Sequence, residues 1–176
     1  MRCWSTSPSG KRGSDSAVRF GIRRQEPAVR LRKETTVSES PVPLRFVTEQ
    51  EMQVEQLPWG PHEWLSRPEL TEADKLLLVR VKMPVGEAHK FHRHPEMEEI
   101  IYVLSGTAEQ WVDREKRILT TGQIAHIPKG VVHGTYNAGE GTLEFLAILS
   151  PAKCEGPVLV DVSEEEPWKS MRDRPQ

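Results

Sequence analysis

Residues 86–106 read GEAHKFHRHPEMEEIIYVLSG. Within this stretch His92 and His94 are two residues apart in a segment predicted to be extended, so both imidazoles should lie on one face, about 7 Å apart at their backbones. The next predicted strand begins with Glu99, and the positions that follow it are apolar on both faces. A carboxylate buried in such a strand needs a compensating partner, for which a cation is suitable. The stretch therefore predicts a cation held between imidazoles and a carboxylate.

A second stretch, residues 122–137, reads GQIAHIPKGVVHGTYN. His133 follows the turn Pro128-Lys129-Gly130 and can supply a third imidazole. Taken alone, His133 is more typical of a core or surface histidine satisfied by hydrogen bonds than of a metal ligand. Its occurrence together with the pair His92 and His94 favours a shared site.

The rest of the chain from residue 41 consists of short segments with strand character, separated by Gly, Pro and polar turns. Residues 41–67 are expected to form entry strands or a cover, and residues 69–75 one helical turn. Short strands at regular spacing are typical of an all-β sandwich or barrel. No internal repeat is present, so we expect one barrel, with its further strands at residues 76–81, 100–104, 107–112, 117–120, 124–127, 135–137 and 143–149.

In the two quoted stretches the chain resembles the cupin superfamily. The first cupin motif is Gly, five residues, His-x-His, three or four residues, Glu, six residues, Gly, and it is matched here by Gly86, His92, His94, Glu99 and Gly106. The second motif is Gly, five residues, Pro-x-Gly, two residues, His, three residues, Asn, and it is matched by Gly122, Pro128, Gly130, His133 and Asn137. The fifteen residues between the motifs resemble the spacing of compact single-barrel cupins.

The resemblance implies a single cupin (jelly-roll) β-barrel in which Gly86, Gly106, Gly122 and Gly130 permit tight turns and Pro128 ends a strand. It further implies that the metal ligands are His92, His94, Glu99 and His133. The six residues before Gly106 select Glu99 over the adjacent Glu98, which is expected to be a neighbour that does not bind metal.

Three imidazoles and one carboxylate suit one divalent transition metal, namely Fe, Mn, Ni, Co, Cu or Zn, and argue against Ca or Mg. The resemblance implies a metal-dependent enzyme acting on a small organic substrate, either a dioxygenase-type oxidoreductase or an isomerase or lyase. The alternative is a non-catalytic module that binds a sugar or another small molecule. Fold alone does not choose between them.

The charge of the chain is distributed unevenly. Residues 1–40 hold nine Lys/Arg against four Asp/Glu, whereas the remainder holds fifteen against twenty-two. We predict a disordered basic tail at 1–40, a barrel domain at 41–160 and a C-terminal tail at 161–176. The Arg-rich and Ser-rich start suits an organelle transit peptide or sequence upstream of a misassigned start, and we favour the second interpretation.

The mildly acidic barrel region lacks a clustered basic surface, which argues against nucleic acid as a partner. No apolar run is long enough to span a bilayer. Cys3 and Cys154 are too few for a disulfide framework or a thiolate site, so a reducing cytoplasm is expected. Single cupins resemble one another in pairing through barrel edges, and a homodimer is therefore expected.

Other residues invite further interpretation. His126 shares strand parity with Ile124 and either faces the interior as a proton shuttle or lies at the surface; His89 gives a weaker signal. Aromatic residues are candidates for a substrate pocket or for the core and a subunit interface, namely Tyr102, Trp111 and Tyr136. Trp59 and Trp64 are expected to cover the barrel mouth, and Trp168 to pack the C-terminal segment onto the body.

Overall fold

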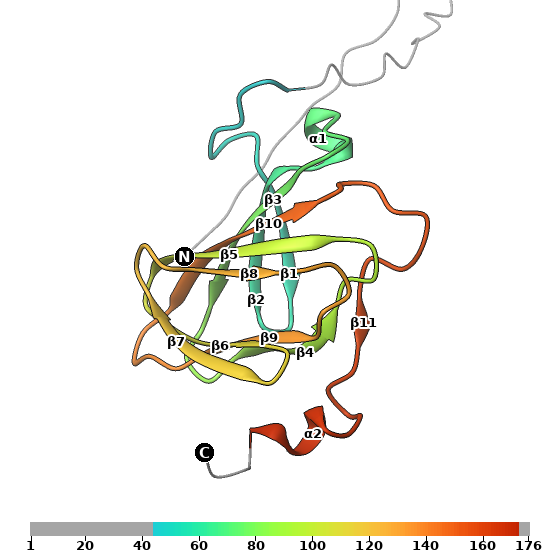
Figure 1. Ribbon diagram of the computed structural model, residues 1–176. Coiled ribbons are helices and arrows are strands. Elements are labelled where there is room, and N and C mark those ends of the chain that lie inside the picture. Colours follow the sequence, from blue (N-terminus) through green and yellow to red (C-terminus); the bar gives the residue numbers. More distant parts are fainter. Residues whose placement is uncertain (1–43, 173–176) are drawn as a thin grey trace, which may run out of the picture. The chain divides into compact units, whose positions relative to one another are not determined.

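The computed structural model describes residues 44–172. The predicted basic tail at 1–40 and Cys3 lie outside these residues. Within them the chain forms two antiparallel sheets that face each other, with short loops between the strands (Figure 1). The predicted all-β cupin-type barrel is therefore confirmed.

The larger sheet has six strands and is continuous from a hairpin at one edge to a short strand at the other. In spatial order its strands are β1 (Gln53–Leu57), β2 (Gly60–Ser66), β3 (Leu77–Met83), β10 (Leu143–Ser150), β5 (Glu98–Ser105) and β8 (Ile124–Ile127). A single helical turn, α1 (Pro68–Thr71), connects β2 to β3. Neighbouring strands come from distant parts of the sequence, so the sheet brings the N-terminal hairpin beside the C-terminal half of the barrel.

The smaller sheet has five strands, which in spatial order are β11 (Val160–Asp161), β4 (Ala88–Arg93), β9 (His133–Asn137), β6 (Thr107–Val112) and β7 (Glu115–Thr120). β9 begins at His133, two residues before the predicted start. Strands β6 and β8 coincide with their predicted ranges.

Strict alternation of buried and partly exposed residues runs along β3 and β10. Their inward residues belong to a core that fills the space between the sheets, as expected of period-two strands with one face packed. Four residues of this core are fully buried, with 0% of their surface exposed: Met83, Val103, Ala108 and Leu143. Burial of these side chains stabilises the fold by roughly 1.5–3 kcal/mol for each large one.

The turns that the motifs assigned to glycine require that residue. Gly86, Gly106, Gly122 and Gly130 all have positive φ, as predicted. At Gly106 a Cβ atom would also lie 2.9 Å from Leu143 Cα, so that any side chain there would press β5 against the start of β10. The turn after β5 thus depends on glycine for conformation and for space.

A second, smaller core lies on the outer face of the five-stranded sheet. It contains Phe91, Trp111, Tyr136, Val162 and Met171, the last from helix α2 (Trp168–Met171), which lies beyond that sheet in Figure 1. Trp168 packs here as predicted, with its ring centroid 5.6 Å from that of Phe91. The C-terminal segment therefore covers the sheet that carries the histidines.

The inferred burial of both faces of β5 is wrong. Glu99, Ile101 and Val103 are buried, but Ile100 is partly exposed and Tyr102 is 38% exposed. The outer face of this sheet has no covering layer among residues 44–172, which explains the difference. No helix in the same range is long and apolar enough to cross a membrane.

Candidate metal centre

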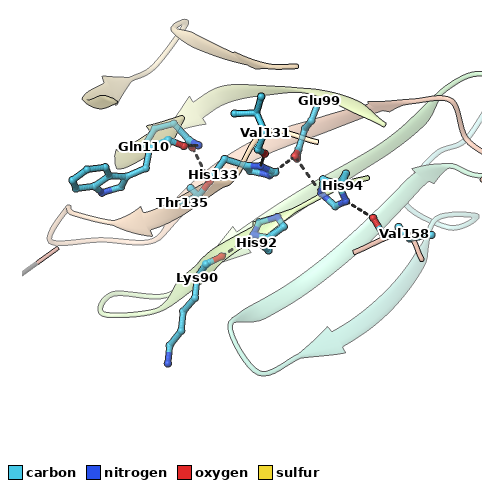
Figure 2. Close-up of polar contacts among 10 residues, drawn as sticks. Lys90, His92, His94, Glu99, Gln110, Val131, His133, Thr135 and Val158 are labelled. Atoms are coloured by element: carbon cyan, nitrogen blue, oxygen red, sulfur yellow. Dashed lines mark hydrogen bonds and ion pairs between the residues drawn. The ribbon is translucent and has the colours of Figure 1, made fainter. Parts of the chain in front are cut away.

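Four side chains that are distant in sequence meet between the two sheets. His92 and His94 come from β4 and the residue after it, His133 from the start of β9, and Glu99 from β5 of the opposite sheet. One ligand atom from each lies within 4.8 Å of the others, and all four residues are buried. Figure 2 shows the three rings and the carboxylate directed toward one another. The structure thus brings together all four residues that the motifs selected.

Each imidazole is held by a backbone carbonyl on the side away from the cluster. His92 Nδ1 lies 2.6 Å from the carbonyl oxygen of Lys90, His94 Nδ1 2.6 Å from that of Val158, and His133 Nδ1 3.0 Å from that of Val131 (Figure 2). A carbonyl can only accept, so each Nδ1 carries the proton and donates it. In the neutral rings Nε2 is therefore left with a lone pair directed at the centre of the cluster.

The carboxylate of Glu99 closes the cluster. Its Oε2 lies 2.8 Å from His133 Nε2 and 3.4 Å from His94 Nε2. Burial alone would raise the pKa of Glu99, but the neighbouring His133 and His94 rings outweigh it and lower that pKa well below its usual range. Burial acts to lower the pKa of His94, yet the Glu99 carboxylate outweighs it and raises that pKa. The carboxylate is therefore ionised, and a nearby positive charge would stabilise it.

The remaining ring behaves differently. Burial, reinforced by the neighbouring His89 and His133, lowers the pKa of His92 well below its ordinary value, so this ring is neutral. Its Nε2 has no hydrogen-bond partner among the described residues, and neither His133 Nε2 nor Glu99 Oε2 completes a well-aligned hydrogen bond there. Buried polar atoms without partners are rare in folded proteins. Lone pairs converging with an ionised carboxylate fit a divalent transition metal.

The motif spacing also separated two adjacent glutamates, and their surroundings differ accordingly. Glu99 is 5% exposed and points into the cluster, whereas Glu98 points outward, with its Oε2 3.4 Å from His126 Nε2. His126 is exposed, so the suggestion that it faces the interior is wrong and its surface alternative is confirmed.

A cavity of about 540 Å³ opens above the cluster. Its walls come from both sheets, from the β1–β2 hairpin and from residues 158–161. Trp59 and Trp64 line it, in agreement with their predicted place at the mouth. Tyr102, Trp111 and Tyr136 do not: Tyr102 is on the outer face of β5, and the other two belong to the second core. None of the three therefore lines the cavity above the cluster.

Two further histidines line the cavity. The His89 ring stacks on the rings of His92 and Trp59, with distances between ring centroids of 3.6 Å and 4.2 Å respectively. His62, on β2, is 4% exposed and contacts Trp59 edge-on, with its Nδ1 3.0 Å from the carbonyl oxygen of Gly60. Burial lowers the pKa of both rings, in His89 to about 3. Sequence reasoning gave His89 little weight and omitted His62.

A β-bulge explains the position of His89. His89 pairs with Thr135 and His92 pairs with His133, so β4 has two residues between these pairs where β9 has one. Strict alternation would turn a residue three positions before His92 to the opposite face. The extra residue restores His89 to the inner face. The local sequence contains no signal that would have revealed this.

Comparison with known protein families agrees with this geometry. The family model of the cupin domain matches residues 79–149. The chain is 30% identical over 102 residues to the pectin degradation protein KdgF of Dickeya dadantii. The aligned residues cover 57% of this chain and 92% of that protein. It is also 30% identical over 73 residues to an oxalate-binding protein of Thermotoga maritima, covering 42% of this chain and 60% of that protein.

Solved structures show the same similarity. The fold matches a protein described as a predicted oxalate decarboxylase from Thermotoga maritima with a TM-score of 0.53 and 26% identity, covering 60% of this chain and 97% of that one. It matches KdgF from Halomonas sp. with a TM-score of 0.53 and 24% identity, covering 62% of this chain and 94% of that one. The second likeness concerns the fold alone.

Proposed function

The chain belongs to the cupin superfamily, and from that premise we propose that it is a metal-dependent enzyme acting on a small organic substrate. The metal is held by His92, His94, Glu99 and His133. The observation that carries the proposal is the set of three imidazoles whose Nδ1 atoms are fixed by backbone carbonyls while their Nε2 atoms converge with one buried carboxylate. In this arrangement the Nε2 lone pairs and the carboxylate oxygens point at one position, where a single cation can bind all of them.

The bound ion is one of Fe, Mn, Ni, Co, Cu or Zn, because imidazole and carboxylate suit these metals and no thiolate lies in the cluster. Such an ion supplies Lewis acidity toward a carbonyl or hydroxyl oxygen, or redox chemistry if it is iron. The protein's part is to hold the ligands in register, to orient the substrate in the cavity and to exclude bulk water. Four protein ligands leave coordination positions for the substrate if the ion takes six.

Two reaction classes fit this site. With iron the proposal is a dioxygenase-type oxidation; with another metal it is an isomerisation or lyase reaction on a carbonyl-containing substrate. The names of two relatives concern pectin degradation and oxalate, which is consistent with a ligand that carries at least one oxygen-bearing group. The alternative is a non-catalytic binding module, favoured by the likeness to an oxalate-binding protein.

Elemental analysis of the purified full chain tests the metal. We expect about one transition-metal ion per chain, and the double variant His92→Ala/His94→Ala should lose it while Glu98→Gln retains it. Equal metal content in the double variant and the parent protein would refute the site.

Oxygen consumption separates the reaction classes. After anaerobic reconstitution with Fe(II), uptake of dioxygen with some members of a substrate panel, and not with others, supports the oxidative reaction. Turnover without dioxygen supports isomerase or lyase chemistry. Thermal stabilisation by a ligand with no turnover under any metal supports the binding module.

We propose a homodimer, since the outer face of the six-stranded sheet leaves Tyr102 and Ile124 exposed beside partly exposed Ile100. We propose a reducing cytoplasmic location, with which the unpaired thiol of Cys154 is consistent. Analytical ultracentrifugation and fractionation of the native host test them.

A further inference from the structure

We infer that the substrate of this site has an apolar body that lies against the six-stranded sheet and a single oxygen-bearing end that reaches the histidine cluster. This inference rests on the proposed function, because the oxygen-bearing end is the part that the metal would bind. It names a class of substrate: a hydrocarbon or aromatic body with one chelating head.

One wall of the cavity consists of hydrocarbon. The inner face of the six-stranded sheet contributes side chains that carry no hydrogen-bonding group, namely Val79, Val81, Ile101, Phe145, Ala147 and Leu149. The backbone behind them is no better able to bind polar groups. β10 lies between β3 and β5 and pairs with both along most of its length, so its amides and carbonyls are already used.

Apart from Glu99, the polar groups of the cavity lie outside the wall formed by β3, β10 and β5. At the inner end are the clustered ligands, and at the mouth are the exposed side chains of Glu87, Lys90 and Asp161. Thr135 lines the opposite wall, but its hydroxyl already donates to Gln110 Oε1 at 2.7 Å. On the hairpin side Trp59 and Trp64 extend the apolar surface. The rings of His62 and His89 pack against Trp59 on that side, and His62 Nδ1 is already bound to the carbonyl oxygen of Gly60.

This lining is unsuitable for a polyhydroxylated sugar acid. Each hydroxyl turned toward the hydrocarbon wall would lose its hydrogen bonds to water and find no replacement. Oxalate presents the opposite problem, since two carbon atoms fill little of a cavity of about 540 Å³, which is of the size that holds drug-like molecules. The ligand chemistry of this chain therefore differs from that suggested by the names of its relatives.

A series of hydroxamates tests the inference on the full chain loaded with Zn(II). The head group is constant, and the body grows from acetohydroxamate through butano- and hexanohydroxamate to octanohydroxamate. Isothermal titration should show binding that tightens about 2- to 4-fold for each added methylene, the value for moving a methylene out of water. The matched polar probe is glucuronic hydroxamate, which should bind no more tightly than acetohydroxamate. A flat series, or tighter binding of the sugar probe, overturns the inference.

Substitutions on the wall locate the effect. Ala147→Leu fills the space in front of β10 and should weaken octanohydroxamate about 10-fold while leaving acetohydroxamate unchanged. The control is Leu146→Phe, which enlarges the neighbouring residue of β10 on the outward face of the sheet. It should leave the binding of both hydroxamates unchanged. Should Ala147→Leu fail to fold, Val79→Thr places a hydroxyl on the same wall and should weaken only the longer ligands. Equal loss for all chain lengths contradicts the proposed placement of the body.

The outcomes distinguish this inference from the function on which it rests. Zinc uptake followed by a flat chain-length series overturns the apolar body and leaves the metal site intact. Absence of zinc uptake overturns both. Octanohydroxamate that binds as tightly to His92→Ala/His94→Ala as to the loaded parent shows that the head does not reach the metal, and that result also overturns the inference.

Discussion

The inner faces of the two sheets border the same cavity but carry different chemistry. Apart from Glu99 and His62, the six-stranded sheet presents aliphatic and aromatic side chains, whereas the five-stranded sheet presents His89, His92, His133 and Thr135. Burial of the apolar side chains on the first face stabilises the folded state. The second buries polar groups, which is unfavourable unless each finds a partner. The barrel thus separates packing and chemistry onto opposite walls.

The five-stranded sheet compensates on its other side. Phe91, Trp111 and Tyr136 alternate with the inward polar residues and pack under Val162 and Met171, which the C-terminal segment supplies. The Nδ1 atom of each ligand histidine is also satisfied by a carbonyl. A sheet that carries a buried polar site can therefore keep its stability if its outer face is covered by a separate apolar core.

The largest expected effect follows from removing the one charged residue of the hydrocarbon wall. Glu99→Gln should reduce metal occupancy from about one ion per chain to near zero, because the amide cannot replace the ionised carboxylate that balances the ion's charge. Elemental analysis measures it. Glu98→Gln, on the outer face of the same strand, is the matched control, and an equal loss in both variants would contradict the assignment of Glu99.

The second prediction concerns the outer core of the five-stranded sheet. Trp111→Ala should lower the free energy of unfolding by about 3–5 kcal/mol, because the indole is buried and leaves a large cavity. Chemical denaturation of the metal-free protein measures it. Trp168→Ala, whose ring is only partly buried in the same core, should cost less. If Trp111→Ala costs no more than Trp168→Ala, the outer core does not support the sheet.

The third prediction uses the buried imidazoles. The pKa of His92 is lowered well below its ordinary value and that of His89 to about 3, so the unfolded chain binds protons near pH 6.5 that the folded chain refuses. Stability of the metal-free protein is then fully present above pH 6.5 and falls as the pH decreases. Burial lowers the pKa of His62 in the same direction. The raised pKa of His94 acts in the opposite direction, since its contribution is complete below pH 6.5, but one ring offsets only part of the other three.

The net loss between pH 7 and pH 5 should be about 2–3 kcal/mol. Denaturation at a series of pH values measures it, and His89→Phe should make the dependence shallower by about 2 kcal/mol over the same interval because one titrating ring is gone. A dependence unchanged in His89→Phe would show that this ring does not resist protonation in the folded chain.

The smallest expected effect concerns the hydrogen bond between Thr135 and Gln110. Thr135→Val leaves Gln110 Oε1 without its donor in a site where both side chains are 2% exposed, which should cost about 1–2 kcal/mol. Denaturation again measures it. Thr121→Val, at the exposed turn after β7, is the control with the same chemical change and should be close to neutral. A neutral Thr135→Val would mean that water replaces the lost donor.

Most of the strands and the four clustered residues could be predicted from the sequence because they depend on local signals. Alternation and turn residues determine where Thr107–Val112 and Ile124–Ile127 begin and end. The two-residue period brings His92 and His94 to one face. The choice of Glu99 over Glu98 came from motif spacing, and the inward position of Glu99 agrees with it.

The incorrect or incomplete expectations involve relations between segments. Trp111 neighbours the inward Gln110, so alternation turns it outward, and whether that side is solvent, interface or core depends on residues 162–171, which return from the C-terminal end. His126 faces solvent because β8 is the edge strand and its outer side is uncovered. His89 is inward because of a bulge that exists only in the pairing of β4 with β9.

The sequence by itself therefore determined most of the strand pattern and the glycine turns, since each follows from spacing along one segment. The four residues of the cluster came from two separate motifs through the resemblance to cupins. It did not determine the shape or lining of the cavity above them. That lining combines strands that are far apart in the sequence, such as β1 with Leu57 and β11 with Asp161. The polarity of each wall therefore depends on which strands the fold brings to face each other. The contrast between a hydrocarbon wall and a histidine wall, and with it the inferred class of substrate, emerged only when the two sheets were packed together.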